Sequence, residues 1–276
     1  MITRNAAHFL PGCLDALRRQ SIADVEIVVV DDHSDDDTPA VVGSAGDARI
    51  VYVRNERHAG VAASRNRGVA LARSPSVFFT DADCRPLRSW VEEGLRTFAE
   101  RDCAGVEGRT LPPRHVLSLA HRSVINEEGG QWQTCNIAYR RDAILGAGGF
   151  DARYVNAYED RDLALRVQRR GAIVFCPDMV VFHELIRWTW KRVVSDGMRA
   201  RDRVRLIVEH GDRSALWGRV VEPRGLAIVL CPLILLLYFP VRSARDLAAI
   251  PMLWVRSVVQ RAAIWRAAWR ARRFLV

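Results

Sequence analysis

Short apolar runs alternate with segments of helical periodicity along the N-terminal part of the chain. Runs at 25–30, 50–53 and 76–80 have the length and composition of strands buried within a sheet. Apolar or small residues recur at helical spacing before and between them, in 6–21, 38–42 and 60–72. Because strands and helices alternate, the pattern predicts an α/β fold with a doubly wound sheet flanked by helices.

The pattern is less regular after residue 90. It predicts helices at 90–101 and 159–170, a helical turn at 142–145, and short strands at 136–139, 173–175 and 179–182. Gly171 closes the helix at 159–170, and His183 follows the final strand. Residues 105–133 mix apolar and polar positions without a clear period, so no element is predicted there.

A continuous apolar segment lies near the C-terminus, at 226–239, interrupted by Pro232. As a helix it would span roughly 21 Å, which is short of the roughly 30 Å hydrocarbon core of a bilayer. We therefore expect an interfacial or re-entrant segment rather than a single crossing. A buried core helix or a dimer interface is the alternative interpretation.

Charge is distributed unevenly. The whole chain carries +9, yet residues 241–276 alone contain eight arginines and one acid, a balance of +7. The first 240 residues are therefore nearly neutral, which argues against a nucleic-acid-binding protein. A basic tail that also contains Trp254, Trp265 and Trp269 is typical of a segment that contacts an anionic membrane surface.

The six cysteines are scattered and include no CxxC pair. A disulfide scaffold or a zinc finger would need closer spacing, so we expect reduced thiols in a cytosolic setting.

Acidic residues come directly after two of the predicted strands. Asp31 and Asp32 follow the first strand, and Asp81 and Asp83 follow the third. The carboxyl ends of parallel strands form the edge where open α/β sheets bind ligands. Paired carboxylates there can bind a divalent cation that is shared with a substrate phosphate. A separate carboxylate, for which the Glu159-Asp160 pair is the candidate, can serve as a base; helix N-terminal charge is its alternative role.

The motifs around these acids resemble those of family two glycosyltransferases. Residues 27–38 resemble the "VDDxSxDxT" element, 60–66 the "GxxxARN" stretch, and 77–83 the strand that carries a DxD motif. Residues 148–171 resemble "GGFD…EDxDLxxRxxxxG". The order and spacing agree over roughly residues 3–185.

The resemblance implies a GT-A fold with a mixed sheet, and inverting transfer of a sugar from a nucleotide-diphosphate donor with Mn2+ or Mg2+ as cofactor. By position, it implies that Asp160 is the catalytic base and that Asp83 and His183 bind the metal. Donor-binding roles fall on Thr3, Asp31, Asp32, Arg65 and Asp81, with Asp81 contacting ribose or metal and Arg65 either steering the diphosphate or pairing with a surface acid. Glu159 and Trp188 are expected near the acceptor or behind the base, with packing as the alternative role of Trp188.

Two departures from the family pattern affect these expectations. The apolar first strand before "TxN" is missing, because the chain begins Met1-Ile2-Thr3, so either the start codon is assigned too late or the sheet lacks most of that strand. The "QxxRW" element is absent after Asp160. Its absence favours transfer of a single sugar over processive polymer synthesis.

We therefore expect a hexosyltransferase with a catalytic domain at 1–215 and a membrane-associated helical region at 216–276. Its predicted acceptor is a cell-envelope or lipid-linked glycan, and its predicted location is the cytoplasmic face of a bacterial cell membrane. A catalytically inactive scaffold of the same fold is one alternative. A sugar-1-phosphate nucleotidyltransferase is another, although the chain lacks the Gly-rich basic loop expected after the first strand.

Overall fold

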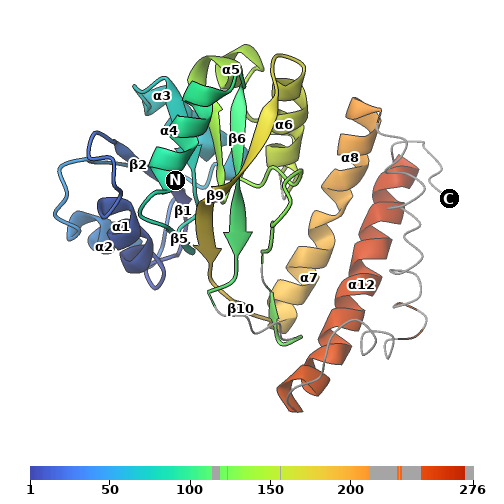
Figure 1. Ribbon diagram of the computed structural model, residues 1–276. Coiled ribbons are helices and arrows are strands. Elements are labelled where there is room, and N and C mark those ends of the chain that lie inside the picture. Colours follow the sequence, from blue (N-terminus) through green and yellow to red (C-terminus); the bar gives the residue numbers. More distant parts are fainter. Residues whose placement is uncertain are drawn as a thin grey trace. The chain divides into compact units, whose positions relative to one another are not determined.

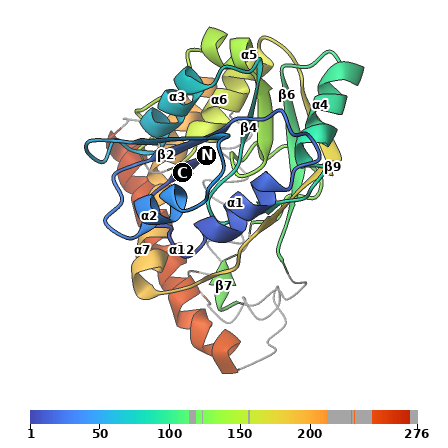
Figure 2. The ribbon, with the colours of Figure 1, turned by 90° about the vertical axis from the view of Figure 1, so that its left-hand side faces the viewer.

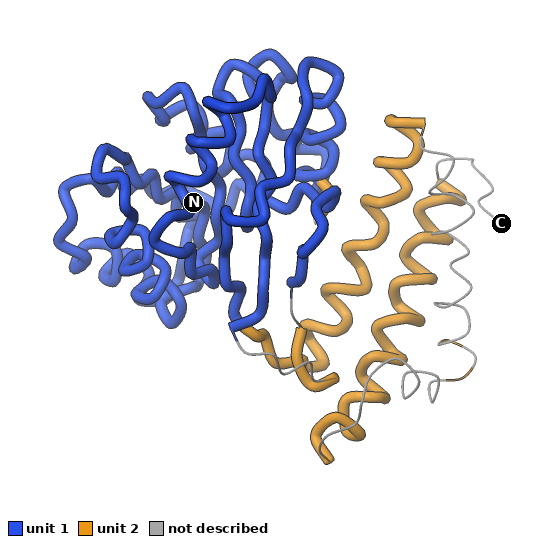
Figure 3. Tube along the Cα trace, in the orientation of Figure 1, with its two compact units in different colours: residues 1–113, 124–155, 159–184 blue, residues 114–123, 156–158, 185–276 orange. Residues whose placement is uncertain are grey.

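The computed structural model describes residues 1–113, 119–122, 124–155, 157–211, 229, 231 and 244–270. The chain forms two compact units, shown separately coloured in Figure 3. Unit 1 contains residues 1–113, 124–155 and 159–184, and unit 2 contains 114–123, 156–158 and 185–276. The predicted boundary between residues 215 and 216 lies outside the described residues and stays a prediction.

Unit 1 is built on a sheet in two parts. The first part is parallel, in the order β1-β2-β3, with bounds Ile2–Thr3, Ile27–Asp31 and Ile50–Arg54. The second is mixed, in the order β4-β8-β6-β9-β5, with bounds Ser76–Phe79, Ile137–Arg140, Gly105–Leu111, Ile173–His183 and Cys84–Pro86. A parallel bridge between Ile2 and Asp81 joins the two parts. The mixed α/β sheet expected from the resemblance is thereby confirmed.

Strand β1 has two residues. They pair with Val30 and Asp31 of β2, and the Met1 ammonium donates a hydrogen bond of 2.9 Å to the Val28 carbonyl. This short strand still occupies the place between β2 and Asp81, so the carboxyl ends of β2 and β4 lie at one edge of the sheet.

Helices of unit 1 cover both faces of the sheet (Figures 1 and 2). Figure 2 shows β4 and β6 between α4 on one side and α3 and α6 on the other. The packing of β8 shows the same two layers. Ala138 packs with α1 and α4 on one face of the sheet, whereas Ile137 and Tyr139 pack with α3, α5 and α6 on the other. The helix bounds are Leu10–Arg18 (α1), Thr38–Gly43 (α2), Val61–Leu71 (α3), Trp90–Glu100 (α4), Arg141–Gly146 (α5) and Glu159–Gln168 (α6).

The two short strands predicted at 173–175 and 179–182 are one continuous strand, β9, so this prediction was wrong. The break in the sequence pattern around Pro177 is a bulge rather than a loop, since β6 residues Gly108 and Arg109 pair with Cys176 and Val180. The extra residues of β9 therefore lie opposite a single peptide of β6.

The side chain of Asn136 fills the space at this bulge. Its amide donates to the carbonyls of Arg109 (2.8 Å) and Met179 (3.0 Å), and its oxygen accepts from Trp90 Nε1 (2.8 Å). Asn136 is 1% exposed, so these hydrogen bonds are buried within unit 1.

Replacing Asn136 by alanine is expected to lower the free energy of unfolding by about 3 kcal/mol, because buried polar partners on three elements lose their hydrogen bonds. Chemical denaturation followed by fluorescence measures this change. The exposed Leu145→Ala variant serves as control and should fall within about 0.5 kcal/mol of the unaltered chain. An equally small effect for Asn136→Ala would show that the bulge does not depend on these bonds.

Unit 2 is helical, with one small two-stranded sheet. Strand β7 (His121–Arg122) pairs antiparallel with β10 (Ile186–Arg187). Helices α7 (Trp190–Arg199) and α8 (Arg201–His210) follow one another alongside α12 (Ala244–Arg270), as Figure 1 shows. Val204 and Ile207 of α8 pack against Ile264 of α12.

The expectation for the apolar segment 226–239 stays a prediction. Apart from residues 229 and 231, the predicted segment 226–239 lies outside the described residues. Within the part of the chain that the structure describes, α12, with 27 residues, is long and apolar enough to cross a membrane by length and composition. The exposed fractions of Trp254, Trp265 and Trp269 on this helix are 38%, 56% and 73%.

Candidate active site

Arg65 of α3 connects the end of β4 to the start of α6. Its guanidinium is buried, hydrogen-bonds the carboxylate of Glu159, and lies 3.6 Å from Asp81 Oδ1. The same group lies 5.6 Å from the centroid of the Phe150 ring. The sequence leaves open whether Arg65 steers a diphosphate or pairs with a surface acid. In the structure its partners are Asp81, at the sheet edge, and the buried Glu159.

Asp160 follows Glu159 in the first turn of α6. Burial and the adjacent Glu159 carboxylate raise the pKa of Asp160 to about 7, against the opposing charge of Arg65. Tyr158, directly before the helix, has a φ of 74°, a conformation that is rare for residues other than glycine and often found at functional sites. A carboxyl group that titrates near neutrality at a sheet edge has the properties of a general base.

Asp83 and His183 meet because β5 pairs antiparallel with β9, with Cys84 opposite His183. The distance from His183 Nε2 to Asp83 Oδ1 is 3.6 Å. His183 Nδ1 lies 3.0 Å from the Glu184 carbonyl, which can only accept, so Nδ1 donates in this contact and Nε2 faces Asp83. One carboxylate oxygen and one imidazole nitrogen held in this way suit Mn2+ or Mg2+, so these residues fit the implied metal.

The buried carboxylates of Asp31 and Asp32 shape the neighbouring loops. Asp31 accepts from Ser34 N (2.9 Å), Ser34 Oγ (2.6 Å) and Tyr52 Oη (2.7 Å). Asp32 accepts from the backbone of Ala59 (2.7 Å) and Gly60 (2.9 Å), which precede α3, and these bonds contribute to a lowered pKa despite the opposing effect of burial. Their predicted contacts with the nucleoside stay predictions.

Two threonine hydroxyls lie buried beside Asp81. Across the described ranges, the hydroxyls of Thr3 and Thr80 have no hydrogen-bond partner. Thr3 ends β1, and Thr80 directly precedes Asp81. Buried polar atoms without partners are uncommon and often mark a place that a ligand or a water completes. The donor-binding role expected of Thr3 stays a prediction.

Trp188 belongs to unit 2. Its ring is buried there, with the guanidinium of Arg256 at 5.7 Å from the ring centroid, and its backbone N–H donates to the Ala120 carbonyl (3.0 Å). These contacts give Trp188 a packing role within unit 2. Its predicted role near the acceptor stays a prediction.

The sequence pattern did not identify Glu107, a buried carboxylate in β6. It lies in the irregular region 105–133, where the sequence offers no local signal that this acid is buried. Its oxygens accept hydrogen bonds from a loop that precedes β8.

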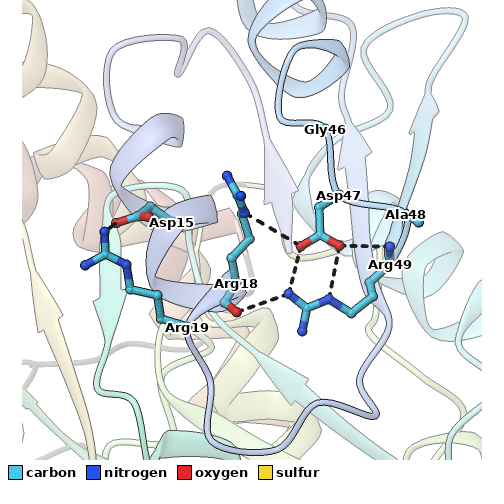
Figure 4. Close-up of a pocket in the computed structure, with 7 residues that line it drawn as sticks. All are labelled: Asp15, Arg18, Arg19, Gly46, Asp47, Ala48 and Arg49. Carbon is cyan, nitrogen blue, oxygen red and sulfur yellow. Dashed lines mark hydrogen bonds and ion pairs between the residues drawn. The ribbon is translucent and has the colours of Figure 1, made fainter.

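A polar pocket lies at the opposite edge of the sheet, between the end of α1 and the loop that precedes β3 (Figure 4). Asp47 accepts three hydrogen bonds from Arg49, two from the guanidinium and one from the backbone N–H, and lies 4.0 Å from Arg18, while Arg19 pairs with Asp15 at 3.0 Å. Each of these arginines has an acidic partner, and the pocket is at the amino end of β3. It is therefore separate from the carboxyl edge where Asp81 lies.

Comparison with known proteins identifies a family and a fold. A sequence model described as "Glycosyl transferase family 2" matches residues 1–144, which is over half of the chain. The chain is 28% identical over 222 residues to the pre-mycofactocin glycosyltransferase of Mycobacterium tuberculosis, covering 71% of this chain and 45% of that protein. Glycosyltransferase AglE of Haloferax volcanii is 30% identical over 194 residues, with 65% and 64% covered. The chain thus spans less than half the length of the mycobacterial relative.

Solved structures of GT-A type share the fold. The mannosyltransferase PcManGT of Pyrobaculum calidifontis, in complex with GDP-Man and Mn2+, has a TM-score of 0.65 and 17% identity, covering 94% of this chain and 85% of that one. TarS residues 1–349 of S. aureus, in complex with UDP, has a TM-score of 0.57 and 14% identity, with 100% and 91% covered. At these identities the likeness shows the fold alone.

Proposed function

The chain belongs to glycosyl transferase family 2, and we propose that it transfers a single sugar from a nucleotide-diphosphate sugar to an acceptor hydroxyl, with inversion and with a divalent cation. The observation that carries this proposal is the contact of Arg65 with both Asp81 and Glu159. It brings the donor-side acid at the end of β4 next to the helix that begins with Glu159 and Asp160.

Asp160 supplies the base in this proposal. Its raised pKa makes the carboxylate a stronger proton acceptor than an exposed aspartate while leaving it ionised above neutral pH. It removes the proton of the acceptor hydroxyl as that oxygen attacks the anomeric carbon from the face opposite the leaving group. A single displacement of this kind inverts the anomeric centre.

Asp83 and His183 would hold the cation, and the bound cation supplies Lewis-acid stabilisation of the leaving diphosphate. PcManGT was solved with GDP-Man and Mn2+, which supports this choice of donor class and metal. The nucleoside of the donor binds at the carboxyl edge of the sheet, where its contacts are Thr3, Asp31, Asp32 and Asp81.

Membrane association is proposed for the C-terminal region. Helix α12 combines exposed Trp265 and Trp269 with exposed Arg266 and Arg270, and both residue types favour the interface of an anionic bilayer. An enzyme attached in this way at the cytoplasmic face of the membrane can reach a cell-envelope or lipid-linked glycan. The acceptor hydroxyl would belong to such a glycan.

The rate of donor hydrolysis, with water as the acceptor, should rise with pH through about 7. Asp160 accepts a proton only when ionised, and burial together with Glu159 raises its pKa to about 7. Glu159→Gln removes a negative charge that raises this pKa, so the rising part of the pH–rate profile, its acid limb, should move to lower pH. Release of the nucleoside diphosphate, followed from about pH 5 to pH 9, measures the limb.

The exposed Asp142→Asn variant is the control and should leave the acid limb in place.

The raised pKa of Asp160 also has a consequence for the stability of the folded chain. Since the folded chain favours the protonated form of Asp160, the contribution of this group to stability should decline as pH rises through about 7. An acid limb near the ordinary pKa of an aspartate would remove Asp160 from the role of base.

A further inference from the structure

The carboxylate of Glu107 organises the loop that precedes β8. The residue is 2% exposed, and its Oε1 accepts from Asn126 Nδ2 (2.8 Å) and from the backbone N–H groups of Gln131 (3.0 Å) and Trp132 (2.5 Å). Oε2 accepts from the N–H of Gly130 (2.6 Å). All four partners are neutral donors, three of them from consecutive backbone positions, so the loop wraps around one negative charge.

The loop needs this support because its backbone is unusual. Gly129 and Gly130 have φ values of 81° each, and Trp132 has a φ of 54°. Positive φ suits glycine but is costly for a tryptophan, so surrounding contacts must hold it. Asn126 adds a further contact, since its Oδ1 accepts from Gly129 N (3.0 Å) while its amide reaches Glu107.

Trp132 connects this loop to the start of α6. The guanidinium of Arg161 lies 5.4 Å from the centroid of the Trp132 ring, and Arg161 directly follows Asp160. The ring also packs against the apolar cluster that contains Leu163 of the same helix. A continuous set of contacts therefore runs from Glu107 through Trp132 to the first turn of α6.

We propose that Glu107 is a positioning residue for the base Asp160, acting through the loop at 126–132 and the contact of Trp132 with Arg161. This inference rests on the proposed function, because it assigns Asp160 the role of base. Packing alone would not call for a carboxylate at this position, since an apolar side chain avoids the cost of burying a charge. What the carboxylate adds is the fixed backbone path that directs Trp132 toward α6.

The test is a double-mutant cycle on the rate of donor hydrolysis. Glu107→Ala and Trp132→Ala are expected each to lower kcat by about 10- to 100-fold, since small displacements of a catalytic group have effects of this size. The double variant should be no slower than the slower single variant, because both changes break the same set of contacts. Trp132→Phe keeps a ring for Arg161 and should restore most of the rate. Donor affinity with Mn2+, measured by calorimetry, should stay unchanged throughout.

Glu107→Gln keeps the shape of the side chain but turns an N–H toward Gly130 N, so an intermediate loss of kcat is expected. It replaces Glu107→Ala in the cycle if the alanine variant does not fold. The matched control is Glu128→Gln, an exposed acid of the same loop, which should retain the full rate.

Additive losses in the cycle, or a fall in donor affinity equal to the fall in kcat, would overturn the positioning role and indicate general destabilisation. Full activity of Glu107→Gln and Trp132→Ala would overturn it as well. If the unaltered chain binds no UDP-, GDP- or dTDP-sugar and releases no nucleoside diphosphate, the proposed function fails and the positioning role fails with it. The two failures are thus distinguishable by the behaviour of the unaltered chain.

Discussion

Asp160→Asn is expected to reduce the rate of donor hydrolysis by about 10²- to 10⁴-fold, the range typical of losing a general base. Asparagine keeps the shape of the side chain but accepts no proton at neutral pH. The rate of nucleoside diphosphate release, measured at saturating donor and Mn2+, gives the size of the effect.

Donor binding separates this loss from a loss of structure. Because the base acts on the acceptor, Asp160→Asn should bind the donor as tightly as the unaltered chain does. The control is Asp142→Asn, an exposed acid in the first turn of α5. A variant at Asp160 that retains its rate would move the role of base to another residue.

Asp83→Ala is expected to weaken Mn2+ binding by roughly 100-fold or more and to remove the metal-dependent part of the activity. The variant leaves His183 Nε2 without the neighbouring carboxylate at 3.6 Å, and an imidazole beside the Cys84 thiol is a poor site for a hard cation, which prefers oxygen ligands. Titration with Mn2+, followed by the electron paramagnetic resonance signal of the free ion, measures the affinity.

Asp178→Ala is the matched control, since Asp178 is an exposed acid on the same strand as His183. It should bind Mn2+ as the unaltered chain does. Equal Mn2+ affinity of Asp83→Ala and Asp178→Ala would contradict the assignment of Asp83 and His183 as metal ligands.

The parts of the fold that local patterns predict are those whose side chains are apolar. Strand β2 consists of β-branched residues that end at an acid, and α3 has small residues at helical spacing, so both are visible in the sequence. Asp31 is the last residue of β2 and Asp32 follows it, so the predicted end of this strand also gives the place of the two carboxylates. The motif resemblance then adds Asp83, Asp160 and His183 by position.

The sequence pattern did not predict strand β6, because this strand contains polar residues whose hydrogen-bond partners lie far along the chain. Glu107 bonds to the loop at 126–132, and the bulge at Gly108 is filled by Asn136. Strand β5 is three residues long and likewise has no local signal, yet its pairing with β9 brings Asp83 to His183. Such contacts depend on register between distant segments, which no local period encodes.

The measurement that tests the central claim most directly is a thermal-shift panel of UDP-, GDP- and dTDP-sugars, each with and without Mn2+. A bound ligand stabilises the folded chain in proportion to its affinity and concentration. We expect a Mn2+-dependent rise in Tm with one nucleotide, lost in Asp83→Ala and kept in Asp160→Asn. The absence of any shift with every donor, in a sample shown to be folded, would contradict the assignment of a donor site and favour an inactive scaffold of the same fold.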